Sequence, residues 1–160
     1  MDKKELTVFI GGPIQCAIES NGAFNKRLHQ LIENVTSKTQ SMGFRVLSAH
    51  VYENFGKMDV SGMYAEVCSR DFKWMNDCDA YIAILPLKPN GEIIHSSGTY
   101  VELGWASALK KKIVIIRDSA PKYSHLVAGL YAIADVKELF LNNEDFEERL
   151  NQCLIGLINV

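Results

Sequence analysis

The chain has 160 residues, of which 48% are hydrophobic, and its formal net charge is −2. This length fits one domain with a sizeable core, which excludes a disordered chain, and the scattered lysines and arginines leave no basic footprint for nucleic acid. No run approaches the roughly 18 apolar residues of a membrane span, and the polar start lacks the apolar segment of a signal peptide. We therefore expect a cytoplasmic protein that binds neither nucleic acid nor membranes.

Short apolar runs rich in valine and isoleucine alternate with longer segments of helical character. The runs mostly lack alternation with polar residues, which is typical of strands buried on both faces of a parallel sheet. We predict a single domain over residues 1–160 with an α/β fold, in which helices flank a five-stranded parallel sheet of the flavodoxin-like or Rossmann-like type in three layers. In chain order the expected elements are strand 6–10, helix 23–42, strand 44–47, helix 61–76, strand 80–85, helix 99–110, strand 113–116, helix 123–130, strand 136–140 and helix 144–158.

The first loop at the expected ligand edge of this sheet begins with Gly11, Gly12 and Pro13. Ligands of such sheets bind beyond the carboxyl ends of the strands, and glycines let a ligand approach the backbone closely. A plain tight turn would need the same residues. The full GxGxxG fingerprint is absent, so the pattern disfavours a dinucleotide site and leaves a small-ligand contact or a turn.

Polar residues also mark the ends of the second and third predicted strands. His50 and Glu53 follow the second strand on the ligand side, although a lone histidine there is more often a hydrogen-bonding residue than a catalyst. Asp79 precedes the third strand, where a turn residue is usual and a ligand contact is the alternative. Four aromatic residues could stack on a planar base or simply pack in the core: Phe9, Tyr52, Phe55 and Trp74.

Asp71 places a carboxylate within the apolar stripe of a predicted helix. Its helical neighbours are apolar or weakly polar: Val67, Cys68, Trp74, Met75 and Cys78. An unpartnered carboxylate buried there would cost several kcal/mol or have a raised pKa, as general acids often do. A structural ion pair with Arg70 or another base is the alternative that spacing alone favours.

The segment from Ser96 to Glu102 combines two local signals. Ser96, Ser97 and Gly98 offer hydroxyls and amides at the positive end of a helix, which suits one phosphate, although such residues often only cap helices. Thr99 and Glu102 have the spacing of a capping box. On that pattern Glu102 lies in the first helical turn, where the helix dipole would keep its carboxylate ionised.

Metal and disulfide chemistry are not indicated. The four cysteines show no CxxC spacing and the histidines no HxxxH-type pairing, so we expect reduced thiols, no metal and no cofactor.

Four stretches in order, "VFIGGPI", "RDFKWMNDCDAYIAIL", "SSGTYVELGWASALKKKIVII" and "YSHLVAGL", resemble the nucleoside 2-deoxyribosyltransferase superfamily over about residues 6–135. The Gly-Thr-x-x-Glu-Leu-Gly core is the most specific element. The likeness is closer to the N-glycosidases of nucleoside 5′-monophosphates, namely the 2′-deoxynucleoside 5′-phosphate N-hydrolases and the cytidylate and hydroxymethylcytidylate hydrolases. It implies hydrolysis of a nucleotide such as CMP to free base and (deoxy)ribose 5-phosphate. Base exchange by a deoxyribosyltransferase and a non-catalytic nucleotide sensor are the alternatives.

The resemblance also implies roles for single residues. Glu102 matches the family's nucleophile or oxocarbenium stabiliser, and Asp71 matches the general acid or sugar-positioning group. Ser124 matches a serine that reaches the phosphate from a neighbouring subunit, which implies a homodimer. The full set of predicted substrate-binding residues, including those from the loop analysis, is Phe9, Gly11, Gly12, Ile14, His50, Asp79, Ser96, Gly98 and Ser124.

The expected chemistry agrees with two carboxylates in different environments. Cleavage of an N-glycosidic bond needs one ionised carboxylate and one proton donor. We expect Glu102 to stay ionised near the helix start and Asp71 to stay protonated longer in its apolar stripe. Three features depart from the family pattern: phenylalanine at position 9 where the deoxynucleotide hydrolases have tyrosine, Gln15 where some cytidylate enzymes have arginine, and a long loop 86–95 that is a candidate lid.

Overall fold

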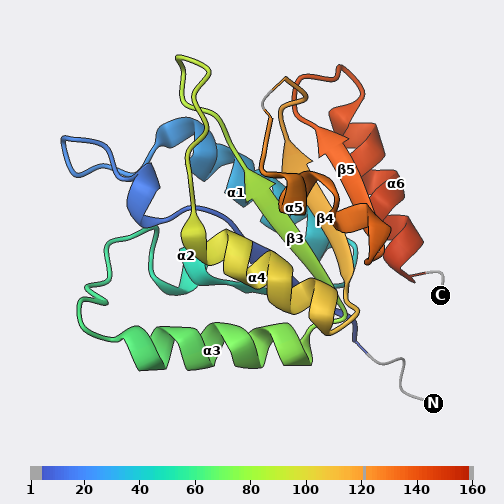
Figure 1. Ribbon diagram of the computed structural model, residues 1–160, viewed down its shortest axis with the longest axis horizontal. Coiled ribbons are helices and arrows are strands. Elements are labelled where there is room, and N and C mark those ends of the chain that lie inside the picture. Colours follow the sequence, from blue (N-terminus) through green and yellow to red (C-terminus); the bar gives the residue numbers. More distant parts are fainter. Residues whose placement is uncertain (1–4, 121, 159–160) are drawn as a thin grey trace.

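The computed structural model describes residues 5–120 and 122–158. Its centre is a five-stranded sheet in which all neighbouring strands run parallel and the order is β2-β1-β3-β4-β5 (Figure 1). This order is that of the flavodoxin-like type, so the predicted fold class is confirmed. The strands are β1 (Thr7–Gly11), β2 (Arg45–Ser48), β3 (Ala80–Leu85), β4 (Lys112–Arg117) and β5 (Val136–Phe140).

Helices cover both faces of the sheet and complete the three layers (Figure 1). One apolar cluster joins the sheet to α1 and α6, and a second joins the opposite face to α3 and α4. The helices are α1 (Lys26–Ser41), α2 (Ala49–Tyr52), α3 (Tyr64–Asp77), α4 (Ser97–Ala108), α5 (His125–Ala128) and α6 (Phe146–Ile158), with 3-10 turns at Gln15–Ala17 and Leu130–Ala132. Among the described residues, no helix is long and apolar enough to cross a membrane.

The structure corrects one predicted helix and adds one that was not predicted. The segment 123–130 forms only the four-residue α5 and then a 3-10 turn, with Gly129 at the C-cap of α5. The four-residue α2 was not predicted; it follows β2 directly and is capped by the Ser48 hydroxyl, which accepts a hydrogen bond from the Val51 amide at 3.5 Å.

The loop after α2 has an unusual backbone. Asn54, Phe55 and Gly56 all have positive φ, at 48°, 52° and 79°. For a bulky residue such as Phe55 this conformation is strained and persists only where surrounding structure imposes it. Here the Phe55 ring stacks on His29 of α1 with ring centroids 3.6 Å apart. The loop is therefore held in one path as it leaves the carboxyl edge of the sheet.

Candidate active site

Two adjoining cavities form a cleft at the carboxyl edge of the sheet, where the loops after β1, β2 and β3 meet. The small cavity, of about 140 Å³, lies between the turn from Gly11 to Cys16 and the start of α4. The large cavity, of about 860 Å³, lies between α3, α4 and the loop 56–63. Eight residues line both cavities and are called the junction: Ile14, Gln15, Glu53, Val67, Asp71, Ser97, Gly98 and Glu102.

Glu102 projects from α4 into the junction and is held there by Tyr81. The Tyr81 hydroxyl, which is fully buried on β3, donates a hydrogen bond to Glu102 Oε2 at 2.5 Å. Gly11 makes room for this pair, because a Cβ at that position would lie 2.3 Å from the Tyr81 hydroxyl oxygen and 2.4 Å from Glu102 Oε2. The glycine that ends β1 is thus required by the carboxylate beside it.

The capping-box prediction for Thr99 and Glu102 is wrong. Ser96 is the N-cap of α4, and its Oγ accepts hydrogen bonds from the Thr99 amide at 3.3 Å and the Thr99 hydroxyl at 2.8 Å. The helix consequently starts at Ser97, and Glu102 lies beyond its first turn. The Glu102 carboxylate is free to turn away from the helix end toward Tyr81.

Burial controls the protonation of Glu102. Loss of hydration raises the pKa of Glu102 to about 8, with the Tyr81 hydrogen bond acting in the opposite direction and the negative charge of Asp71 adding to the rise. The expectation that the helix dipole keeps Glu102 ionised is therefore wrong for the empty site. At neutral pH the buried carboxyl holds its proton, since an ionised group there would lack sufficient solvation.

This raised pKa predicts a pH-dependent stability. Unfolded Glu102 titrates near 4.5 and the folded group near 8, so its contribution to the unfolding free energy is present below pH 4.5 and is lost as the pH rises toward 8. We expect a loss approaching about 1.4 kcal/mol per pH unit within this window. The measurement is urea unfolding of the wild type and Glu102→Gln across that range.

The difference between the two proteins isolates Glu102. His50, whose pKa burial lowers to about 4, titrates in part of the same window with the opposite sign, but it is present in both proteins. A wild-type minus variant difference that does not change with pH would contradict the burial effect on Glu102.

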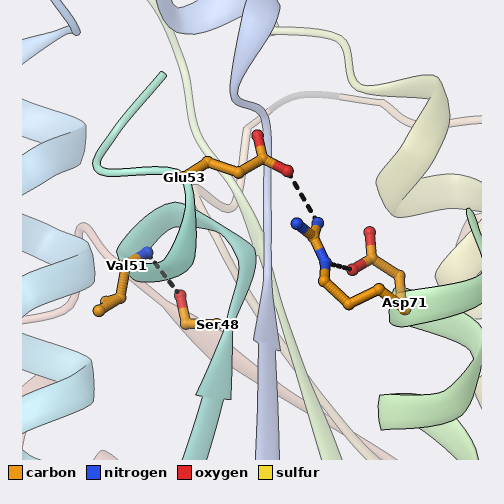
Figure 2. A network of polar contacts seen from close by, with 5 residues as sticks. Ser48, Val51, Glu53 and Asp71 are labelled. Carbon is orange, nitrogen blue, oxygen red and sulfur yellow. Dashed lines mark hydrogen bonds and ion pairs between the residues drawn. The ribbon is translucent and has the colours of Figure 1, made fainter. Parts of the chain in front are cut away.

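Asp71 lies in the junction and is ion-paired, as the structural alternative predicted. Arg70 Nε donates to Asp71 Oδ1 at 2.8 Å and Arg70 Nη2 donates to Glu53 Oε1 at 2.8 Å, so one guanidinium bridges two carboxylates (Figure 2). Desolvation still raises the pKa of Asp71, although Arg70 acts against the rise. Asp71 therefore has both features that the sequence offered as alternatives, an ion pair with Arg70 and a raised pKa.

The structure brings several other predicted residues to the cleft. Gly11, Gly12 and Ser96 line the small cavity, while Ile14 and Gly98 line both cavities. These positions surround Glu102 from the β1 loop on one side and from the α4 start on the other.

Phe9, His50 and Asp79 do not line the cleft, and their predicted contacts with substrate are not supported by position. Phe9 is fully buried, with its ring centroid 5.2 Å from that of Tyr81. His50 is also buried, and its Nε2 lies 3.0 Å from the Pro13 carbonyl oxygen, so it supports the β1 turn from behind. Asp79 lies at the amino end of β3, the opposite edge of the sheet, and accepts a hydrogen bond from the Thr7 amide at 2.8 Å.

Ser124 and the loop 86–95 also lie apart from the cleft in the single chain. Ser124 is exposed and caps α5, so its predicted reach into a neighbouring subunit stays a prediction. The loop after β3 forms a projecting hairpin with a bridge between Leu87 and Ile93, and only His95 of this loop lines a cleft cavity (Figure 1). The loop that lines the large cavity, together with α3 and α4, is 56–63 and not 86–95.

Sequence reasoning missed Tyr81, although one signal was available. Tyr81 is the only polar side chain in the strand "AYIAIL", which is buried on both faces. A buried tyrosine hydroxyl normally finds a hydrogen-bond partner, so a tyrosine there indicates a nearby acceptor. Glu102 is that acceptor.

Comparison with known proteins supplies the family. The family model for nucleoside 2-deoxyribosyltransferase matches residues 20–152 of the chain. The protein belongs to the nucleoside 2-deoxyribosyltransferase family. No curated protein sequence matches it.

Several solved structures share the fold of this chain. The CMP N-glycosidase BcmB of Clostridium botulinum is 24% identical, with 92% of this chain and 97% of that chain covered and a TM-score of 0.59. BlsM is 23% identical, with 95% and 90% covered and a TM-score of 0.70. A 2-deoxyribosyltransferase of Bacillus psychrosaccharolyticus is 16% identical, with 94% and 95% covered and a TM-score of 0.63. At these identities the likeness shows the shared fold alone.

Among the residues that the structure describes, no group of three or more histidine, cysteine, aspartate or glutamate side chains is arranged to hold a metal ion. The four cysteines of this family member are free, with Cys16 and Cys68 exposed and Cys78 and Cys153 buried.

Proposed function

We propose that the protein hydrolyses the N-glycosidic bond of a nucleoside 5′-monophosphate, such as the pyrimidine nucleotide CMP, to free base and (deoxy)ribose 5-phosphate. The observation that carries the proposal is the position of Glu102. This carboxylate lies at the junction, between a serine-rich helix start and a large apolar cavity. A nucleotide has its phosphate, sugar and base in the corresponding order.

The small cavity suits the phosphate. It is lined by Ser96, Ser97 and Gly98 at the N-terminus of the 12-residue helix α4. Free amides and the positive end of the helix dipole favour an anion there. Gly98 has open space where a Cβ would be, so the helix start is accessible to a ligand.

The large cavity suits the base. Its wall is largely apolar and includes Ile18, Met58, Met63, Val101 and Trp105. An apolar slot of this kind buries a planar ring, and sulfur and aromatic groups adapt to its faces. With phosphate and base placed at the two ends, the sugar lies at the junction beside Glu102.

The reaction uses the two junction carboxylates. A Glu102 oxygen, in its ionised form, approaches C1′ of the sugar while the C1′–N bond breaks and its electron pair leaves with the base. Asp71, whose pKa burial raises, donates a proton to the departing base nitrogen. Water then adds its hydroxyl to C1′, displaces Glu102 and returns a proton to Asp71.

A homodimer completes the proposal. Ser124 would supply a hydroxyl to the phosphate of the neighbouring subunit, as the family resemblance implies. The surface near it is unusually apolar for a free monomer, since Leu126, Tyr131 and Ile133 are 85%, 72% and 77% exposed. Burial of these side chains against a second copy would be favourable.

The decisive experiment is incubation of the protein with ribo- and deoxyribonucleoside 5′-monophosphates, followed by chromatography for free base. Release of base with formation of a reducing sugar phosphate supports hydrolysis. Adding an isotopically labelled free base separates the base-exchange alternative, favoured by the 2-deoxyribosyltransferase among the structural neighbours, because a hydrolase incorporates no label. Binding of nucleotides without any base release would instead indicate a sensor.

Tyr81→Phe tests the link between β3 and the reacting carboxylate. The Tyr81 hydrogen bond lowers the pKa of Glu102 from what burial alone would give, so its loss should move the acid limb of the kcat/KM profile above about 8. At neutral pH we expect roughly a tenfold lower kcat/KM, about the effect of one hydrogen bond to a charged group. The measurement is the pH dependence of base release.

Ser41→Ala is the control, because it removes an exposed hydroxyl at the end of α1, outside both cavities of the cleft. Its profile should superimpose on that of the wild type. If the Tyr81→Phe profile superimposes as well, the hydroxyl does not act on Glu102 during the reaction.

A further inference from the structure

Glu53 is a third cleft carboxylate, and the reaction above gives it no role. It follows α2 and is only 2% exposed, yet it lines both the small and the large cavity. The strained backbone at Asn54 and Phe55 begins directly after it.

The guanidinium of Arg70 bridges the carboxylates of Glu53 and Asp71. It uses Nη2 for Glu53 and Nε for Asp71, each at 2.8 Å, and it packs over the rings of Tyr52 and Trp74 at 4.8 and 4.9 Å. With a side-chain exposure of 14%, Arg70 is fixed by charge on one side and by aromatic faces on the other. A planar guanidinium bridges two carboxylates in a way that a lysine cannot.

Each bridged carboxylate uses one oxygen for Arg70. Figure 2 shows the second oxygen of Glu53 and of Asp71 directed away from the guanidinium toward the same side of the network. In the proposed reaction the second oxygen of Asp71 serves the departing base. The second oxygen of Glu53 has no such role, and a carboxylate oxygen beside a guanidinium accepts hydrogen bonds, so it calls for a hydroxyl or N–H donor. Within the described residues, Arg70 donates the hydrogen bonds that these two carboxylates accept.

The position of Glu53 at the junction determines which part of a bound nucleotide it would contact. A phosphate offers acceptors and carries negative charge, so it is excluded by like charge, and the base lies in the apolar cavity beyond the junction. The sugar carries adjacent hydroxyl donors at C2′ and C3′ and lies at the junction. The second oxygen of Glu53, which Arg70 leaves free, matches one of these hydroxyls.

We infer that Glu53, positioned by Arg70, accepts a hydrogen bond from the 2′-hydroxyl of the sugar and makes the site selective for ribonucleotides over 2′-deoxyribonucleotides. The inference rests on the proposed function for the placement of phosphate and base. A 2′-deoxy sugar leaves one buried carboxylate oxygen without its donor, and a site built to bond a hydroxyl discriminates strongly against an analogue that lacks it. The expected preference is about 10- to 100-fold, the size of one charge-assisted hydrogen bond.

The first test measures binding without turnover. Ribose 5-phosphate and 2-deoxyribose 5-phosphate are titrated calorimetrically into the wild type, Glu53→Gln and a control. The control is Glu148→Gln, which makes the same change at an exposed position of α6. We expect the wild type and the control to bind the ribose form at least about tenfold more tightly, and Glu53→Gln to bring the two affinities within about threefold. Equal affinities in the wild type, no binding of either compound, or an unchanged ratio in Glu53→Gln would each overturn the inference.

The second test follows base release from CMP and dCMP. Glu53→Gln should lower kcat/KM for CMP by about tenfold or more and leave that for dCMP nearly unchanged. Arg70→Lys keeps a positive charge but cannot bridge both carboxylates, so it should narrow the CMP/dCMP ratio in the same direction. A merely structural Glu53 would lower both rates equally, and thermal unfolding checks that each variant is folded.

The two tests separate this inference from the proposed function. If no nucleotide releases base but Glu53→Gln still equalises the sugar phosphate affinities, hydrolysis is wrong and the sugar site stands. If base is released from CMP and dCMP alike, and Glu53→Gln changes neither ratio, hydrolysis stands and the role of Glu53 is wrong.

Discussion

Replacing Glu102 by glutamine should lower the rate of base release by roughly a thousandfold while the protein stays folded, comparable to the loss of a principal transition-state contact in other enzymes. Glutamine has nearly the same shape as glutamate but can neither bond covalently to C1′ nor offer a full negative charge to an oxocarbenium ion. The buried position strengthens the effect, because a charge acts more strongly where water is excluded. Base release by Glu102→Gln under saturating nucleotide gives the measurement.

Folding provides the control for this variant. Glu102 is buried with a pKa near 8, so an amide in its place removes a group that is costly to ionise, and Glu102→Gln should unfold at the same or a higher temperature than the wild type above neutral pH. Glu148→Gln, the same change on the far helix α6, should retain full activity. Wild-type turnover in a folded Glu102→Gln protein would remove Glu102 from the mechanism.

The charges of the cleft favour a cationic transition state. Three carboxylates, those of Glu53, Asp71 and Glu102, lie near the single guanidinium of Arg70. The charges of Lys57 and Asp59, which also line the large cavity, cancel, so the cleft has more negative than positive groups when all are ionised. In the empty protein, the other two carboxylates help to keep Glu102 protonated. A sugar that develops positive charge at C1′ reverses this effect, since it stabilises ionised Glu102 and is stabilised by it.

The strands could be predicted closely because their signal is local. The run 80–85 was predicted and found as β3, since a short, continuous apolar run suits a strand buried on both faces, and 136–140 was predicted and found as β5. The helix predicted at 123–130 was wrong in length. Its apolar residues include Leu126, which is 85% exposed, so an apolar run there does not report burial in a helix of the core.

The site was predictable only in part. The carboxyl-end rule pointed to the loop before Glu102, because this rule depends on topology rather than on side-chain detail. Asp71 was singled out only by its apolar helical neighbours and by the family resemblance, and the structure brings both carboxylates to the junction. The partner of Glu102 could not be predicted from the capping pattern, because Ser96 and Thr99 both offer hydroxyls for a cap. Tyr81 reaches Glu102 through tertiary packing over 21 residues of chain, which no local motif encodes.

Gly11→Ala should damage both stability and activity. The added methyl would lie 2.3 Å from the Tyr81 hydroxyl oxygen and 2.4 Å from Glu102 Oε2, distances that force one of them to move. Tyr81 is completely buried and has no free space, so we expect the methyl to break the Tyr81–Glu102 hydrogen bond. Overpacking of this kind costs about 1–3 kcal/mol of unfolding free energy. With Glu102 displaced, base release should fall roughly a hundredfold, in line with the loss of a precisely placed catalytic group.

A second change identifies the cause of the damage in Gly11→Ala. Tyr81→Phe in that background removes the oxygen nearest to the new methyl, so urea unfolding should show much of the lost stability restored, while base release stays low because Glu102 still lacks its donor. Gly104→Ala is the control on the same helix as Glu102, since a Cβ there would meet no atom within 4 Å apart from its chain neighbours and the backbone of its own helix. It should raise the unfolding free energy by roughly 0.5–1 kcal/mol and leave activity unchanged. If Gly11→Ala were as stable and as active as the wild type, the close packing of Gly11, Tyr81 and Glu102 would not matter for the reaction.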